Sequence, residues 1–311
     1  MGRARRWWVA TALASVVGLA AAPMSARAGT PVASELKPPP LSQLSAADVV
    51  VPAIARPANP PYRMNFGKAE VYLPTFFQPQ EGAYDLIVHF HGMSSVQEGN
   101  IERARLNAAI VSVNLGFGSG PYEDAYRDPG AFARLVAITA HFIEKSGKAD
   151  GAHLGRVALS SWSAGYGAVA AILRQPANGN RIDALLMAEG PHSDYADKEH
   201  TLVDEAPLTK YLRIAHSARV GDKLFVMTHS AIHTDDYPST TETIGELLKM
   251  AGVEKVANDA VGPRGMQETY ESDSGDFHVK GYEGGGVKDH VDHIRAMGDT
   301  MYPYLKRRWA R

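Results

Sequence analysis

The sequence predicts an α/β fold with a mostly parallel central sheet and helices on both of its faces. Segments typical of strands alternate with segments whose apolar residues recur at helical spacing through most of the 311 residues. From Leu86 onward the strand-like segments are mostly continuous apolar runs, which is typical of strands covered on both faces. Because such alternation needs crossover connections, it favours a parallel sheet wrapped by helices.

The expected elements follow one another from residue 69 to residue 309. Short apolar or β-rich runs predict strands at 69–74, 84–92, 107–116, 155–161, 182–190, 223–230 and 276–284. Apolar residues at helical spacing predict helices at 97–106, 128–145, 164–174, 239–252 and 290–309. In a sheet of this kind reactive groups gather at the carboxyl ends of the strands, so the residues that follow each strand are the first candidates for a site.

The N-terminal part of the chain does not fit this alternation. Residues 1–28 combine a basic start, an apolar run and a final small-x-small tripeptide, which together are typical of a cleaved signal peptide. Residues 29–62 are rich in proline and are expected to form an extended arm. We therefore expect a secreted or periplasmic protein whose folded domain spans 63–311. The alternative is an uncleaved N-terminal anchor.

Composition narrows the class of partner. Residues 1–28 hold four arginines and no acidic residue, so their removal changes the formal net charge from −2 to −6. A mildly acidic protein without basic blocks is not expected to bind nucleic acid, and no later apolar span predicts membrane insertion once the signal peptide is gone. The chain has no cysteine, so its core must hold the fold without disulfides.

Three serines crowd the point where a predicted strand gives way to a helix. A reactive serine on a sharp strand-to-helix turn needs a small residue two positions before it and two positions after it, because the turn brings those backbones together. Ser161 has Leu159 two positions before it, and Ser160 has Trp162 two positions after it. Only Ser163 has small residues on both sides. The alternative is that Ser163 simply caps the helix, since serine is a preferred N-cap residue.

This segment resembles the nucleophile elbow of the α/β-hydrolase superfamily. Ser161-Trp162-Ser163-Ala164-Gly165 stands where members carry Gly-x-Ser-x-Gly, and the order of expected elements resembles the superfamily from about residue 68 to residue 308. Ser161 replaces the first glycine of the pattern, a small-for-small change that leaves the turn sterically feasible. The resemblance implies an α/β-hydrolase fold in which Ser163 is the nucleophile of an acyl transfer.

The resemblance also implies two backbone donors for an oxyanion. One is the amide of Ala164, directly after the nucleophile, and the other belongs to a loop after an early central strand. His91-Gly92 is similar to the superfamily's His-Gly segment, which puts the second donor at the Met93 amide. Gly92 supplies the backbone freedom that such a loop requires, and His91 is expected to hold the loop by hydrogen bonds.

A base is expected after the last strand, where this superfamily carries it. A glycine-rich loop precedes His290, and a helix is expected to follow it. A loop histidine at the carboxyl edge of the sheet can turn its imidazole to Ser163, whereas one inside a helix is more constrained. His290 is therefore the first choice, and His293, one helical turn further along, is the alternative.

The acid that orients the base has two candidate positions in the chain order Ser–acid–His. Glu189 ends a buried apolar run, where a carboxylate is costly unless it has a partner. Asp235 and Asp236 follow the next strand, where the superfamily most often carries its acid, although such a pair is also common in solvated loops. The cost of burial favours Glu189, followed by Asp236 and then Asp235.

Residues 191–222 separate two strands where this fold often carries a small cap, and they are expected to select the substrate. Their charged and polar residues do not suit an apolar lid of the lipase type. Trp162 and Tyr166 either add aromatic walls to the site or simply pack beside the elbow. His89-x-His91 has a ligand-like spacing, but no His-Glu-x-x-His helix accompanies it, so no metal is expected.

Together these residues predict an exported serine hydrolase that needs no cofactor. Ser163, His290 and either Glu189 or Asp236 are expected to cleave a carboxylic ester, in a small molecule or a polymer, through an acyl-enzyme. A serine peptidase or amidase of the same fold is the first alternative. The second is a non-catalytic secreted binding protein on a hydrolase fold, because a fold alone does not imply a function.

Overall fold

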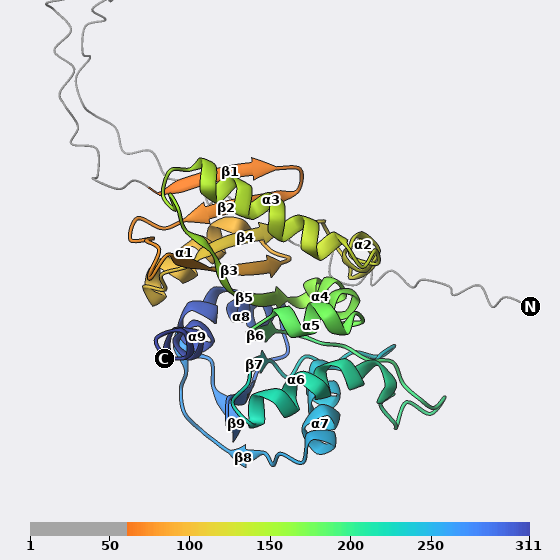
Figure 1. Cartoon of the computed structure of the whole chain (residues 1–311). Helices are drawn as coiled ribbons and strands as arrows, with labels where there is room; N and C mark the ends of the chain where they lie inside the picture. The colour runs from red at the N-terminus through yellow and green to blue at the C-terminus, as the bar shows by residue number, and fades with distance from the viewer. Residues whose placement is uncertain (1–60) are drawn as a thin grey trace, which may run out of the picture. The chain divides into compact units, whose positions relative to one another are not determined.

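In the computed structural model, which describes residues 61–311, one sheet of ten strands runs through the molecule in the order β1-β2-β4-β3-β5-β6-β7-β10-β9-β8 (Figure 1). The central strands from β4 to β10 in this order are parallel, and the strands at both edges pair antiparallel. The strands are β1 (Tyr62–Phe66), β2 (Ala69–Leu73), β3 (Ala83–Phe90), β4 (Ala109–Val113), β5 (His153–Trp162), β6 (Ala184–Ala188), β7 (Leu224–His229), β8 (Val256–Ala257), β9 (Glu268–Ser274) and β10 (Phe277–Tyr282).

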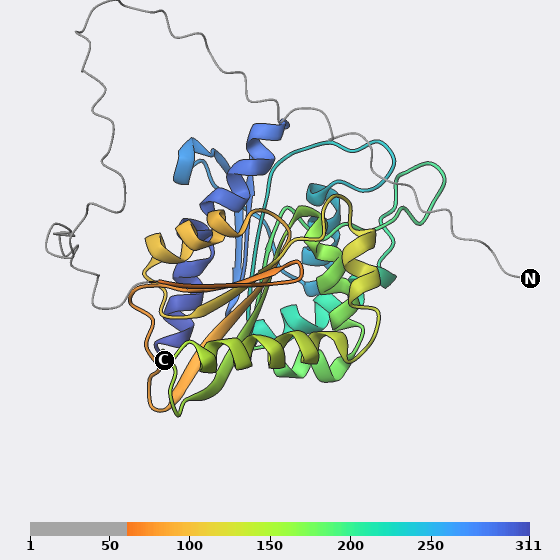
Figure 2. The same ribbon diagram turned by 90° about the horizontal axis from the view of Figure 1, so that it is seen from above.

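Helices cover both faces of this sheet (Figure 2). The helices are α1 (Ser94–Ala104), α2 (Gly120–Ala125), α3 (Ala131–Lys145), α4 (Tyr166–Leu173), α5 (Pro176–Arg181), α6 (Thr209–Arg219), α7 (Thr240–Ala251), α8 (Val287–Thr300) and α9 (Tyr302–Trp309). Apolar residues of α2, α3, α4, α6 and α7 pack on one face, which carries Val88 of β3. Those of α1, α8 and α9 pack on the other face, which carries Ile87. Because neighbouring residues of a strand point to opposite faces, both layers require apolar side chains, as the sequence predicts.

Several elements were not expected from the sequence. These are β1, β8, β9, α2, α5 and α6. In β9 buried and exposed residues alternate and most side chains are polar, so the strand lacks the apolar run used to find the central strands. The single helix expected at 290–309 is two helices, α8 and α9, because Pro303 has no N–H to donate and clashes with the preceding turn.

The expected signal peptide, residues 1–28, and all but the last two residues of the expected arm, 29–62, lie outside the described residues. The segment 191–222, where a small cap is expected, contains α6, whose Tyr211 and Ile214 are buried in the core of the domain. Between residues 61 and 311, no helix has the length and apolarity needed to cross a membrane.

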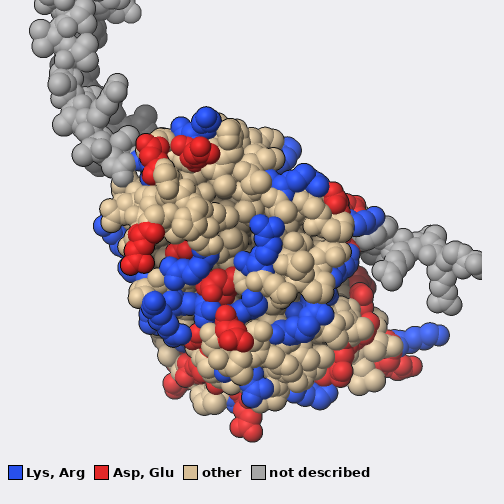
Figure 3. Space-filling model, in the orientation of Figure 1, with Lys and Arg blue, Asp and Glu red and all other residues tan. Residues whose placement is uncertain are grey.

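On the face seen in Figure 3, basic and acidic side chains are intermixed. Several ion pairs join basic and acidic side chains of the domain, such as Arg156 with Asp85 at 2.7 Å. The expected mostly parallel sheet with helices on both faces is confirmed, and the fold is an α/β-hydrolase fold. Its parallel strands bring the carboxyl ends of β3, β5, β6 and β7 to one edge, where the residues of the candidate site follow them.

Candidate active site

Ser163 lies on a sharp turn between β5 and α4. Strand β5 ends at Trp162, one turn of 3₁₀-helix covers Ser163–Gly165, and α4 begins only at Tyr166, two residues later than the sequence predicts. Ser163 has a φ of +46°, a left-handed conformation that L-residues other than glycine rarely adopt. A Cβ atom on Gly165 would lie 2.2 Å from the carbonyl oxygen of Phe90, so the turn requires a glycine two residues after Ser163.

His290 contacts Ser163, although it lies near the C-terminal end of the sequence. Its Nε2 atom lies 2.8 Å from Ser163 Oγ, although the two residues are 127 positions apart. The sequence places His290 in the loop before the helix. In the structure it lies in the first turn of α8. The helix starts early because the Asp289 carboxylate accepts a hydrogen bond from the Gly286 N–H at 2.9 Å, which caps it. The first turn of α8 still lies at the carboxyl edge of the sheet, so the imidazole reaches the serine.

Glu189 contacts the other nitrogen of His290. Its Oε2 atom lies 3.0 Å from His290 Nδ1, and the carboxylate is almost fully buried. The backbone N–H of Ser230 donates to Oε1 at 2.6 Å and the Ser230 hydroxyl donates to Oε2 at 3.1 Å. Burial on its own would raise the pKa of Glu189, but the imidazoles of His293 and His290 and the Ser230 N–H together hold it below its ordinary value. The carboxylate is therefore ionised at neutral pH.

The two aspartates considered for the same role lie elsewhere. Asp235 and Asp236 are exposed in the loop between β7 and α7, and the side chain of Asp235 contacts His233 at 3.3 Å. The carboxylate that meets His290 is that of Glu189, at the end of β6. Because an ionised carboxylate only accepts hydrogen bonds, His290 Nδ1 carries the proton and Nε2 is free to accept one from the Ser163 hydroxyl.

Trp162 ties the elbow to α8. Its indole Nε1–H donates to the backbone oxygen of His290 at 3.0 Å. Its ring is stacked on the imidazole of His91, with centroids 5.0 Å apart, and lies 4.8 Å from the ring of His290. The sequence left two roles open for Trp162, an aromatic wall of the site or packing beside the elbow, and it indicated none of these contacts. The ring of Tyr166 contacts the ring of His192, with centroids 5.4 Å apart.

The loop expected to hold an oxyanion follows β3. His91 and Gly92 both have positive φ values, +74° and +98°, and the His91 N–H donates to Val113 O at 2.9 Å. His91 Nδ1 lies 2.8 Å from the Tyr122 hydroxyl, and burial, with the neighbouring His290, lowers the pKa of His91 to about 4. The loop is thus fixed by hydrogen bonds to neutral groups. Met93 is the N-cap residue of α1, and Ala164 follows Ser163 in the 3₁₀ turn.

The other histidine of the His89-x-His91 pair supports this loop from inside the sheet. His89 Nε2 lies 2.8 Å from His91 O and its Nδ1 lies 2.9 Å from Ser160 Oγ. The two rings of the pair therefore have separate partners. Over the described range 61–311, no three His, Asp or Glu side chains are grouped so as to hold a metal ion.

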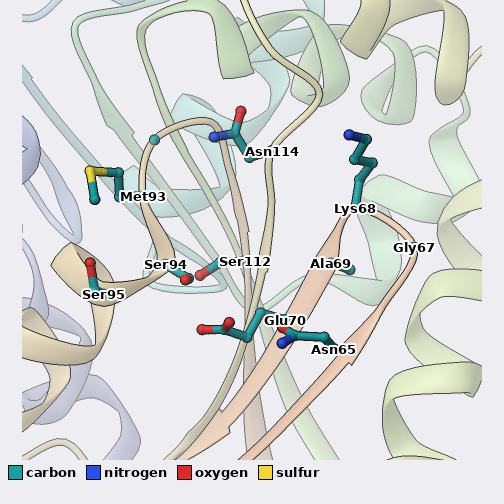
Figure 4. Close-up of a pocket in the computed structure, with 11 residues that line it drawn as sticks. Asn65, Gly67, Lys68, Ala69, Glu70, Met93, Ser94, Ser95, Ser112 and Asn114 are labelled. Atoms are coloured by element: carbon teal, nitrogen blue, oxygen red, sulfur yellow. The ribbon is translucent and has the colours of Figure 1, made fainter. Parts of the chain in front are cut away.

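A pocket of about 370 Å³ lies beside this loop (Figure 4). Gly92, Met93 and Ser94 line one wall of it, and the β1–β2 turn lines the other. Figure 4 shows the side chains of Asn114 and Lys68 on one side of the pocket, across from Ser94, Ser112 and Glu70. The amide oxygen of Asn114 accepts from the Gly116 N–H and the Tyr122 hydroxyl, both at 3.1 Å. The lining includes both polar and apolar surface.

No protein-family model and no curated protein matches the chain. Several solved structures are similar to it. A cold-adapted esterase from an Arctic intertidal metagenomic library is 11% identical, over 80% of this chain and 92% of that one, with a TM-score of 0.41. A feruloyl esterase module from Clostridium thermocellum is 9% identical, over 78% and 86%, with a TM-score of 0.43. A siderophore hydrolase from Aspergillus nidulans is 12% identical, over 83% and 97%, with a TM-score of 0.40.

Proposed function

We propose that this protein is a serine hydrolase that cleaves carboxylic esters through an acyl-enzyme. One observation carries the proposal: an unbroken hydrogen-bond chain from Ser163 Oγ through the His290 imidazole to the Glu189 carboxylate, with distances of 2.8 and 3.0 Å. The positive φ of Ser163 adds support, because backbone strain of this kind clusters at reactive residues.

The groups take the following parts in the reaction. His290 Nε2 accepts the Ser163 proton while Oγ bonds to the ester carbonyl carbon, and the Glu189 carboxylate stabilises the imidazolium. The amides of Met93 and Ala164 are proposed to hold the oxyanion, at about 3 kcal/mol for each donor. The carbon–oxygen bond then breaks, and the alcohol leaves with the proton from His290. Water, activated by the same imidazole, releases the acid and restores Ser163.

The pocket beside Met93 offers hydroxyls, amides and charged groups beside apolar surface, which suits an ester that carries polar groups. We also propose that the protein is exported, with residues 1–28 as its signal peptide and residues 63–311 as the hydrolase domain. This second proposal rests on the sequence of residues 1–28.

A serine-directed fluorophosphonate tests the nucleophile. The parent protein should be labelled, and Ser163→Ala should abolish both labelling and turnover of p-nitrophenyl acetate, a loss of about 10⁴-fold or more. His290→Ala should suppress labelling as strongly, because the hydroxyl then lacks its base. A folded parent that never labels would favour a binding protein, and labelling that persists in Ser163→Ala would assign the nucleophile elsewhere.

Two matched acid variants complete the test. Glu189→Gln keeps the size of the side chain but removes the charge beside His290, so turnover should fall by about 10²-fold or more at similar thermal stability. Asp236→Asn makes the same change in an exposed loop and should leave turnover unchanged. An ester and an amide with the same acyl group then separate an esterase from an amidase.

A further inference from the structure

A second imidazole contacts the oxygen of the Glu189 carboxylate that does not face His290. His293 Nε2 lies 3.2 Å from Oε1, while His290 Nδ1 lies 3.0 Å from Oε2. The two histidines are three residues apart in α8, so their side chains project from the same face of the helix. The proposed reaction uses only His290. His293 is 1% exposed and out of reach of a substrate, so its contact with the acid calls for its own explanation.

The contacts of His293 indicate its tautomer. Because an ionised carboxylate has no proton to offer, the nitrogen that faces it at 3.2 Å, His293 Nε2, carries the imidazole proton. Its Nδ1 lies 3.0 Å from the hydroxyl of Thr228 on β7, which donates to it when the imidazole is neutral. Both nitrogens therefore have partners without a positive charge on the ring.

The surroundings keep that ring neutral. The titratable or charged groups around it are His290, Asp289 and Asp292 on α8, Glu189 after β6, His229 on β7 and Tyr282 on β10. Asp292 is already paired with Arg264 and Lys288, both at 2.6 Å. Burial lowers the pKa of His293 more than the nearby carboxylates raise it. The nitrogen that contacts Ser163 Oγ belongs to His290, whereas both nitrogens of His293 face Glu189 and Thr228.

We propose that His293 is a positioning residue for the reaction at Ser163. Its Nε2–H faces Oε1 of Glu189 at 3.2 Å, so the electrostatic contact positions the carboxylate with Oε2 toward His290 Nδ1 and draws part of its charge away from His290. Ser230 holds the same carboxylate from the β7 side, and His293 holds it from α8. Thr228 supports His293 in turn. This inference rests on the proposed function, because it concerns the acid of that site.

The test compares three variants of the full chain. His293→Leu removes the N–H at similar volume and should lower kcat about ten-fold with KM unchanged, because the carboxylate loses a contact that positions it. The acid limb of the kcat/KM profile should move to higher pH, because the carboxylate then directs its whole charge at His290. His293→Gln keeps an N–H near the Nε2 position and should restore most of kcat and most of the acid-limb position. Met297→Leu alters packing one turn further along α8 and should change neither.

The outcomes separate the inference from the function it rests on. If fluorophosphonate labels the parent but His293→Leu leaves kcat and the acid limb unchanged, the role of His293 is overturned and the proposed function still stands. Absence of labelling in the parent would overturn both. If His293→Leu does not fold, Thr228→Val takes its place, since it removes only the hydroxyl that fixes Nδ1. It should lower kcat about three-fold and move the acid limb the same way, and an unchanged profile would overturn the proposal.

Discussion

Three residues of the candidate site share an unusual backbone conformation. His91, Ser163 and Glu189 have φ values of +74°, +46° and +55°, and each directly follows a parallel strand. Residues other than glycine rarely adopt this region, and strain of this kind persists only where the surrounding structure imposes it. The sequence identified each of these residues through its place after an apolar run. It could not reveal their strain, because φ depends on packing from distant strands.

At the scale of a single residue, Ser161 offers a clear prediction. It is 1% exposed, and its hydroxyl has no hydrogen-bond partner among residues 61–311. Because an unpaired buried hydroxyl is destabilising, Ser161→Ala should raise the free energy of unfolding by about 1 kcal/mol, measured by urea denaturation. The matched change Ser160→Ala removes a hydroxyl that lies 2.9 Å from His89 Nδ1 and should lower it by about 1 kcal/mol. Equal effects of the two changes would contradict this account.

At the scale of elements, the elbow and the start of α8 define the site together. The sequence predicted the elbow, because its steric rule involves only neighbouring residues. It placed His290 in a loop, because the cap formed by Gly286 and Asp289 was not recognised. It offered His293 only as the alternative base, since nothing local shows that α8 lies against the end of β6. Contacts between elements distant in the chain were the part that could not be derived.

The elbow also predicts the effect of a single methyl group. In Gly165→Ala the new Cβ would lie 2.2 Å from Phe90 O, which belongs to the backbone of β3 and cannot move aside cheaply. We expect a loss of about 3 kcal/mol in the free energy of unfolding. Gly99→Ala makes the same change inside α1, where the nearest atom is the flexible end of Arg103 at 3.5 Å, and should be neutral or stabilising by up to about 1 kcal/mol. Thermal melts of both variants would test this, and equal melting temperatures would contradict it.

At the scale of the whole molecule, the parallel sheet brings residues that are distant in the sequence close together in space. Ser163 and His290 are 127 residues apart, and Glu189 and His290 are 101 apart, yet all three meet at one edge. The alternation of strands and helices predicted this edge, since it requires a parallel sheet. The cost of burying a carboxylate favoured Glu189, which follows β6, over the aspartates after β7. The sequence could not show that Ser230, directly after β7, accommodates this carboxylate with its N–H and hydroxyl.

The same core makes stability depend on pH through its buried histidines. Burial lowers the pKa of His89 to about 3 and those of His91 and His229 to about 4. The unfolded chain takes up protons on these residues near pH 6.5, whereas the folded chain does not. Stability should therefore be fully present above about pH 6.5 and be lost as the pH falls toward 4. His229→Gln should flatten the decline of melting temperature between pH 6.5 and 4.5, because one of the protonation sites is gone. His216→Gln, a change at an exposed position of α6, should leave the slope of the parent unchanged. A parent whose melting temperature does not fall over this range would contradict the assignment of neutral imidazoles to the core.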